Sequence, residues 1–276
     1  MTDRGDEFVG RWTREQVWDA VDEWRWIPPS AQRVVTDEYE LAVTPGSYAL
    51  TYVYGFRVDE PARAEERLLS LRKEVQARGG TGVRFQLTPR TRPSDLGERL
   101  ERHGYRAAEE ADVLVWELRN PDGGIRLPEF PDRAGISVRE VRSDPEYETF
   151  GGLGTLIFGD PAPSEASRTG FLAEFHRKLE EDGHSDRFLA VADGAFIGRG
   201  GLELAGPVAR FWGSGVLPAH RGRGAYGALV RARCESAAAR GSEIVLVTAR
   251  VGTSGPILKR HGFEPVGSVR VYEARW

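Results

Sequence analysis

The sequence predicts an α/β (α+β) fold made of two similar halves, each with a mixed, mostly antiparallel central sheet flanked by helices. Three observations lead to this prediction. In the second half, short strand-like runs separated by turn signals precede a long alanine-rich helix. A segment rich in Pro, Gly and Asp divides the chain near its middle. The two halves also end in similar sequences, which suggests an internal repeat.

The second half begins with a strand and two helical stretches, followed by a meander of strands. Alternation begins at Ile136, and the clearer helical stretch runs from about Glu165 to Glu181. Three strand-like runs then follow at 187–193, 195–204 and 207–216, with turn signals at Asp193-Gly194 and Gly206-Pro207. Turns this tight join antiparallel strands.

A long helix is predicted from about Gly224 to Arg240, directly after the third run of the meander. Gly241 lies just beyond it, where a C-cap glycine is expected. A buried-looking strand at 243–249, a short helix at 254–261 and a last strand at 265–276 complete the chain.

The internal repeat is most evident where LERHGYRAAEEADVLVWEL, from Leu100, matches LKRHGFEPVGSVRVYEARW, from Leu258. Ahead of each lies a helix ending in ARGG or ARGS and then a strand. We therefore predict a first domain at 1–119, a linker at 120–134 and a second domain at 135–276. Two unrelated αβ pieces that share a common helix end are the alternative.

Composition excludes several classes of protein. The net charge of -4 does not suit general binding to nucleic acid. No apolar run approaches the roughly 20 residues that span a bilayer, and the N-terminus lacks the apolar core of a secretory signal, so we expect no membrane partner and a cytoplasmic location. Cys234 is the single cysteine, which excludes an intramolecular disulfide and the usual thiolate metal sites; we expect it to pack in a helix.

A glycine-rich loop lies between the meander and the long helix, in the sequence VLPAHRGRGAYGAL from Val216. Its glycines, Gly222, Gly224 and Gly227, allow close approach to the backbone at the first turn of the helix. A helix start offers N–H groups without intrahelical partners and partial positive charge, which suits a pyrophosphate. Arg221 and Arg223 add side-chain charge.

The position of this loop distinguishes between phosphate-binding folds. A dinucleotide-binding fingerprint follows a first parallel strand, whereas this loop follows an antiparallel meander, and the Gly-Lys-Ser/Thr of a Walker loop is missing. Residues 136–276 instead resemble the GNAT acetyltransferase family. Its R-x-x-G-x-G/A signature is met at Arg221 and Gly224, although Tyr226 takes the last position and the glycine is displaced to Gly227. The sequence from Ser254 to Phe263 resembles the closing helix and Gly-Phe turn of the family.

The resemblance implies an N-acyltransferase that uses acetyl-CoA as co-substrate, without a metal, and a primary amine of a small molecule or peptide as acceptor. It also implies that two strands separate and that the coenzyme lies between them, with the Val216 N–H polarising the thioester. The residues expected to bind the coenzyme are Ser214, Gly215, Val216, Arg221, Gly222, Arg223, Gly224, Ala225, Tyr226 and Gly227.

The chain departs from the family at two catalytic positions. Leu258 stands where many relatives have a tyrosine acid, and Arg210 stands where some have a glutamate base. Glu203 is the nearest acidic candidate for the base, and a solvated or ion-paired strand carboxylate is its alternative role. The missing residues leave open a non-catalytic acyl-CoA-binding or regulatory module, and the sequence also leaves a homodimer open.

The first half has no equivalent loop. Its counterpart, YVYGFRVDEPARAEERLL from Tyr52, has one glycine and no R-x-x-G. It also carries acids that would repel a pyrophosphate, namely Asp59, Glu60, Glu65 and Glu66. We therefore expect this half to be degenerate and not to bind the coenzyme.

Overall fold

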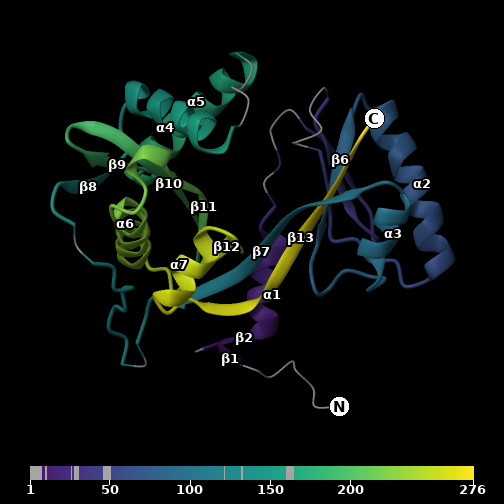
Figure 1. Ribbon diagram of the computed structural model, residues 1–276, viewed down its shortest axis with the longest axis horizontal. Helices are drawn as coiled ribbons and strands as arrows, with labels where there is room; N and C mark the ends of the chain where they lie inside the picture. The colour runs from purple at the N-terminus through teal and green to yellow at the C-terminus, as the bar shows by residue number, and fades with distance from the viewer. Residues whose placement is uncertain are drawn as a thin grey trace. The chain divides into compact units, whose positions relative to one another are not determined.

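The computed structural model describes residues 8–9, 11–25, 27, 31–45, 51–120, 122–131, 133–159 and 165–276 (Figure 1). The chain divides into two compact units. The first comprises residues 1–114, 248–257 and 265–276, and the second comprises residues 115–247 and 258–264. Both combine helices with a mixed, mostly antiparallel set of strands, so the predicted fold class is confirmed.

The elements of the first unit begin with two short strands and a helix. They are β1 Phe8–Val9, β2 Trp12–Thr13, α1 Arg14–Glu23, β3 Gln32–Val35, β4 Glu40–Val43, β5 Tyr52–Tyr54, α2 Pro61–Ala77, β6 Gly82–Leu87, α3 Leu96–Arg102, the start of β7 Arg106–Glu117 and most of β13 Glu264–Arg275. Strands β3, β4 and β5 pair antiparallel, and β5 pairs parallel with β6. Every fourth or third residue of α2 is apolar and buried, at Ala64, Leu68, Leu71 and Val75, so this face of the helix packs into the core formed with β6.

The second unit contains the meander that the sequence predicts. Its elements are β8 Ile136–Glu140, α4 Asp144–Phe158, α5 Glu165–Asp182, β9 Arg187–Ala192, β10 Ala195–Ala205, β11 Val208–Val216, the short 3-10 helix η3 Pro218–His220, α6 Ala225–Ala239, the start of β12 Ile244–Arg250 and the end of α7 Ser254–Arg260. The strands lie in the order β12-β11-β10-β9-β8. Helices α4 and α6 contact these strands from opposite sides (Figure 1).

The two repeats end their helices in the same way. After α2, Gly79 is left-handed and Gly80 N–H donates to Val75 C=O at 2.8 Å. After α6, Gly241 is left-handed and Ser242 N–H donates to Ala237 C=O at 3.0 Å. Both are Schellman motifs, which satisfy the last carbonyls of a helix.

The shorter helices of the two repeats also match. Tyr105 N–H donates to Leu100 C=O after α3, and Phe263 N–H donates to Leu258 C=O after α7. Each aromatic follows a left-handed glycine, Gly104 or Gly262. The repeat predicted from sequence is thus matched in the order of elements and in the hydrogen bonds that end them.

The last strand of the second repeat joins the first unit. In β13, Arg270 pairs with Leu87 and Arg275 with Gly82, so the strand runs antiparallel to β6. Conversely, Leu118, just after β7, donates its N–H to Glu243 C=O in the second unit at 2.7 Å. The predicted domain limits follow the sequence repeat, whereas the compact units follow these strand pairings, and the two divisions therefore differ.

Candidate functional site

Strand β11 separates from β12 partway along its length. The two strands pair in parallel from Val208, opposite Ile244, to Phe211, opposite Val247. Beyond Phe211, β11 continues for five residues to Val216. Within the described part of the chain, this segment pairs with β10 and no longer with β12. One edge of β11 is therefore released from the sheet next to the glycine-rich loop.

A β-bulge lies at the point of separation. Trp212 pairs with Gly201 and Gly215 pairs with Arg199, so two residues of β11 face one residue of β10. The first of the two, Gly213, has a φ of 55°, a left-handed conformation that favours glycine. Because a bulge bends its strand and increases the local twist, it accounts for the departure of β11 from β12.

The backbone of Val216 faces away from β10. Leu217 N–H donates to Ile197 C=O at 2.9 Å, which makes these two residues a hydrogen-bonded pair. Such pairs alternate with non-bonded pairs along an antiparallel ladder, so the groups of Val216, opposite Gly198, point outward. In agreement, Val216 C=O accepts from Arg221 Nε at 3.2 Å. The Val216 N–H therefore points to the side from which β12 has withdrawn.

The glycine-rich loop leads directly into α6. Gly222 and Gly224 are both left-handed, and Gly224 is the N-cap of the helix, without a side-chain cap. Ala228 N–H makes the first intrahelical bond, to Gly224 C=O at 3.1 Å. The N–H groups of Ala225, Tyr226 and Gly227 precede that bond, so they form the partly positive end of a 15-residue helix.

The two loop arginines point to other partners. Arg221 donates to Val216 C=O, and Arg223 contacts His220 Nδ1 and Asp193 Oδ2, both at 3.2 Å. Residues of the predicted linker contact the helix start instead. A Cβ added at Gly224 would lie 2.5 Å from Arg133 Cγ, and one added at Gly227 would lie 2.5 Å from Phe130 Cδ1.

These linker contacts give the two glycines a packing reason that the sequence did not reveal. The linker prediction covers 120–134, of which residues 121 and 132 lie outside the described part of the chain. The rest of the segment is anchored in the second unit, where Trp116 Nε1 donates to Arg126 C=O at 3.0 Å.

The two predicted catalytic residues do not come together. Glu203 pairs across the strands with Arg210, and its carboxylate lies 3.3 Å from Arg210 Nη1. Along β10, Glu203 is five residues beyond Gly198, the partner of Val216, which is a separation of about 16 Å at the rise of a β-strand. This geometry matches the ion-paired alternative for Glu203.

The structure also shows where Leu258 and Cys234 lie. Leu258, at the position of the family's tyrosine, is buried, and so is Cys234, whose pKa burial raises. Among the described residues, no three His, Cys, Asp or Glu side chains are grouped to hold a metal ion. No helix in the described ranges has the length and apolar character that a membrane crossing requires.

Sequence reasoning missed two arginines that contact the bulge. Arg233 on α6 is fully buried and donates to Ser214 Oγ at 2.7 Å. Arg199 on β10 donates from Nε to Gly213 C=O at 3.2 Å. A signal for Arg233 existed, since it lies on the face of α6 otherwise occupied by apolar residues such as Leu229 and Ala237.

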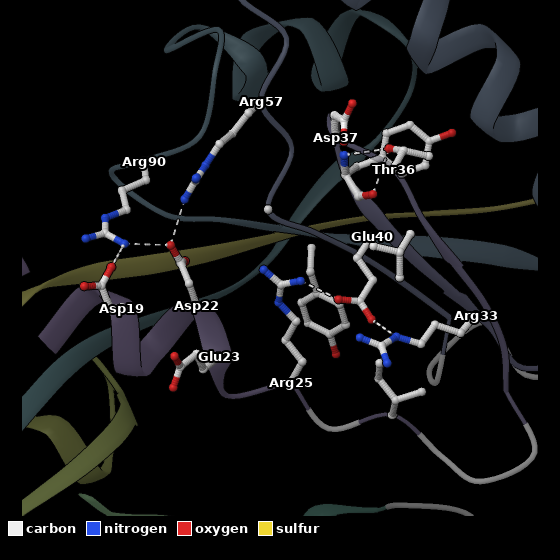
Figure 2. Close-up of a pocket in the computed structure, with 15 residues that line it drawn as sticks. Asp19, Asp22, Glu23, Arg25, Arg33, Thr36, Asp37, Glu40, Arg57 and Arg90 are labelled. Carbon is white, nitrogen blue, oxygen red and sulfur yellow. Dashed lines mark hydrogen bonds and ion pairs between the residues drawn. The ribbon is translucent and has the colours of Figure 1, made fainter. Parts of the chain in front are cut away.

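A separate cavity of about 800 Å³ lies in the first unit (Figure 2). Charged side chains from α1, β3, β4 and the segments after β5 and β6 line it, and none of them belongs to the predicted site. Figure 2 shows Glu40 between Arg25 and Arg33, with which it forms ion pairs, and Asp22 between Arg57 and Arg90. The charges that line this cavity are thus largely paired with each other.

Comparisons with solved structures show which folds the chain resembles. An N-acetyltransferase from Kribbella flavida, described as GCN5-related, is 19% identical with a TM-score of 0.66 over 93% of this chain and 94% of that one. A second from Sphaerobacter thermophilus is 18% identical with a TM-score of 0.65, covering 94% and 85%. A tandem GNAT protein of the clavulanic acid pathway is 18% identical with a TM-score of 0.58, covering 94% and 87%. No curated protein matches the chain.

These structures show that the chain has the fold of GNAT acetyltransferases. The family model for "Acetyltransferase (GNAT) family" matches residues 155–263, which include β9 to β12, the glycine-rich loop and α7. This match agrees with the sequence resemblance of the second half to the GNAT family.

Proposed function

We propose that the protein transfers an acetyl group from acetyl-CoA to a primary amine of a small molecule or peptide. The observation that carries this proposal is the separation of β11 from β12 after Phe211, directly beside the uncapped N-terminus of α6. A thioester with a pantetheine arm can pair with the released edge of β11 while its pyrophosphate lies at the helix end. Both features lie within the part of the chain that matches the family model.

Each part of the site then has a chemical role. The backbone of Ser214, Gly215 and Val216 holds the pantetheine, and the residues from Gly222 to Gly227 hold the pyrophosphate. Arg221 and Arg223 contribute positive charge nearby. The N–H of Val216 donates to the thioester oxygen and stabilises the negative charge that develops there.

The reaction needs a neutral amine nitrogen beside the thioester carbon. A C–N bond forms, the C–S bond breaks, the amine loses a proton to water and the thiolate leaves as coenzyme A. Because position 258 holds a leucine, which has no proton to donate, and Glu203 is paired with Arg210, catalysis depends mainly on proximity and on stabilisation of the oxyanion.

The proposal is tested by calorimetric titration with acetyl-CoA, followed by an assay of coenzyme A release across a panel of amines. Binding together with amine-dependent release is the expected result. Tight binding without release for any amine would instead favour the non-catalytic acyl-CoA-binding module. No binding of acetyl-CoA would refute both.

A further inference from the structure

The bulge in β11 is held from both faces of the sheet by arginine side chains. On the side of α4, Arg199 donates from Nε to Gly213 C=O at 3.2 Å and from Nη1 to Phe150 C=O at 2.9 Å. Its guanidinium carbon lies 3.7 Å from the centre of the Phe150 ring. Arg199 therefore fixes the first residue of the bulge to α4.

On the side of α6, Arg233 makes the corresponding contacts. Its Nη1 donates to Ser214 Oγ at 2.7 Å and to Gly201 C=O at 3.0 Å, and its Nε donates to Leu229 C=O at 2.9 Å. The guanidinium also stacks on Phe211 at 4.2 Å, at the last residue that pairs with β12. Arg233 thus binds both strands at the point where β11 departs.

Glycines of β10 and β11 make room for this arrangement. A Cβ at Gly200 would lie 2.9 Å from Arg233 Cζ, and a Cβ at Gly213 would lie 2.9 Å from Arg199 Nη2. Glycine at these two positions allows both guanidinium groups to lie against the backbone. The bulge, the glycines and the arginines therefore form one structural unit.

Fold stability alone is a poor explanation for Arg233. The side chain is fully buried, and within the described residues its hydrogen bonds go to Leu229 C=O, Gly201 C=O and Ser214 Oγ, with no carboxylate at ion-pair distance. Burial lowers the pKa of Arg233 to about 10, so the group still carries its charge at neutral pH. A buried charge costs free energy of folding, and hydrogen bonds to neutral acceptors, without a carboxylate partner, must offset that cost.

We propose that Arg233 and Arg199 are positioning residues that fix the bulge, so that the Val216 N–H is aimed at the thioester oxygen of acetyl-CoA. Val216 lies two residues beyond Ser214, on a strand segment whose direction the bulge sets. The proposal rests on the proposed function. Replacing these arginines should therefore reduce the polarisation of the bound thioester and change the affinity for the coenzyme only slightly.

The test measures the carbonyl stretch of bound acetyl-CoA carrying a heavy-carbon label in its thioester carbonyl, by infrared difference spectroscopy. The variants are Arg233→Met and the control Arg231→Met on the same helix, where the Arg231 side chain is 42% exposed and pairs with Glu235. The wild type and the control should lower the carbonyl frequency equally on binding. The Arg233→Met variant should lose most of this shift, with a change of less than about threefold in Kd. Its thermal midpoint should fall by several degrees, because acceptors of Arg233 lose their donor, and the spectrum is recorded on the folded, ligand-bound variant.

The kinetic expectation is a fall in kcat of about tenfold to a hundredfold at nearly constant KM, less than the loss from removing an oxyanion donor outright. If Arg233→Met does not fold, the same infrared measurement is made on Ser214→Ala, which removes one acceptor of Arg233 and should also reduce the carbonyl shift. An unchanged carbonyl shift in the folded variant would overturn the inference. A wild type that does not bind acetyl-CoA would instead overturn the proposed function itself.

Discussion

The β5–α2 segment of the first unit and the β11–α6 segment of the second occupy equivalent places in the repeat, but the gap beside the strand differs. In the second unit, β11 loses its pairing with β12 after Phe211. In the first unit, β5 pairs with β6 at Tyr52 and Val53. The segments that follow these two strands pair again at Arg57 and Arg92. The first unit therefore lacks, within its described residues, an open edge equivalent to that of β11.

In the first unit, backbone hydrogen bonds close the gap between the segments that follow β5 and β6. Arg92 N–H donates to Phe56 C=O at 3.0 Å, and Val58 N–H donates to Arg92 C=O at 3.1 Å. These bonds occupy backbone groups at the edge where, in the second unit, we propose that a pantetheine pairs. We infer that re-pairing of the strand, as well as the sequence of the loop, keeps the first half from binding the coenzyme.

The helix starts differ in the same sense. The N-cap of α2 is Glu60, and the next residue, Pro61, has no N–H to offer. The N-cap of α6 is Gly224, followed by Ala225. We expected Glu65 to be one of the acids that repel a pyrophosphate at this helix start. Its carboxylate instead contacts Arg99 and His103 of the α3 region, so its charge is paired there.

The sharpest prediction from this difference is one acetyl-CoA site per chain. Only the second unit combines a released strand edge with an uncapped helix start within the described residues, so a single binding event is expected. Calorimetric titration of pure protein measures the stoichiometry. Two equivalent sites per chain would show that the first half has kept its coenzyme site.

A carboxylate placed at the second helix start should have the next largest effect. The Gly224→Asp variant puts a negative charge where we propose that the pyrophosphate binds, and we expect acetyl-CoA affinity to fall by at least about a thousandfold, or about 4 kcal/mol. The matched control is Ala62→Asp at the start of α2, which should leave affinity unchanged. Equal affinities for both folded variants would place the coenzyme elsewhere.

A smaller effect is expected from the buried carboxylate of the first unit. Glu40 is 2% exposed and paired with Arg25 and Arg33. Burial alone would raise its pKa, but hydrogen bonds from Arg33 and Arg25 outweigh burial and hold the pKa below its usual value. We expect Glu40→Gln to lower the free energy of unfolding at neutral pH by about 1–3 kcal/mol and to leave acetyl-CoA affinity unchanged.

The pH dependence of this variant checks the cause. A carboxyl with a depressed folded pKa contributes stability above its unfolded pKa and loses it as pH falls through the folded value. The stability difference between wild type and Glu40→Gln should therefore shrink below about pH 4. Denaturant unfolding across the acid range measures it, and a difference that stayed constant there would show that charge is not involved.

The smallest effect concerns Glu203 and the reaction itself. Because Glu203 is paired with Arg210 and far along β10 from Val216, Glu203→Gln should lower kcat/KM by less than tenfold, or less than about 1.4 kcal/mol. Without a dedicated base, kcat/KM should rise with pH until near the pKa of the acceptor amine. A thousandfold loss, or a bell-shaped profile independent of the acceptor, would show that a base exists.

Much of the second unit follows from local sequence signals. The meander, the long helix ending before Gly241 and the glycine-rich loop lie where the sequence predicts them. Each is specified by residues close together in the chain, such as turn glycines and apolar residues at helical spacing. The candidate site could be predicted from sequence for the same reason, because Val216 and the loop residues lead directly into the start of α6.

The role of Glu203 was harder to predict. Its separation from Val216 depends on the register between β10 and β11, and a bulge at Gly213 shifts that register by one residue. Likewise, the arginine contacts at the bulge join α6 to β10 and β11, which are brought together only by folding. No local pattern records such contacts.

The sequence by itself determined the repeat, the fold class and the loop that leads into α6, because helix ends, turns and apolar periodicity depend on residues within a few positions of each other. Tertiary structure decided which strand each repeat pairs with, where β11 leaves the sheet and how Phe56, Val58 and Arg92 close the first gap. These features depend on hydrogen bonds between segments far apart in the chain, and several registers can satisfy the same local pattern.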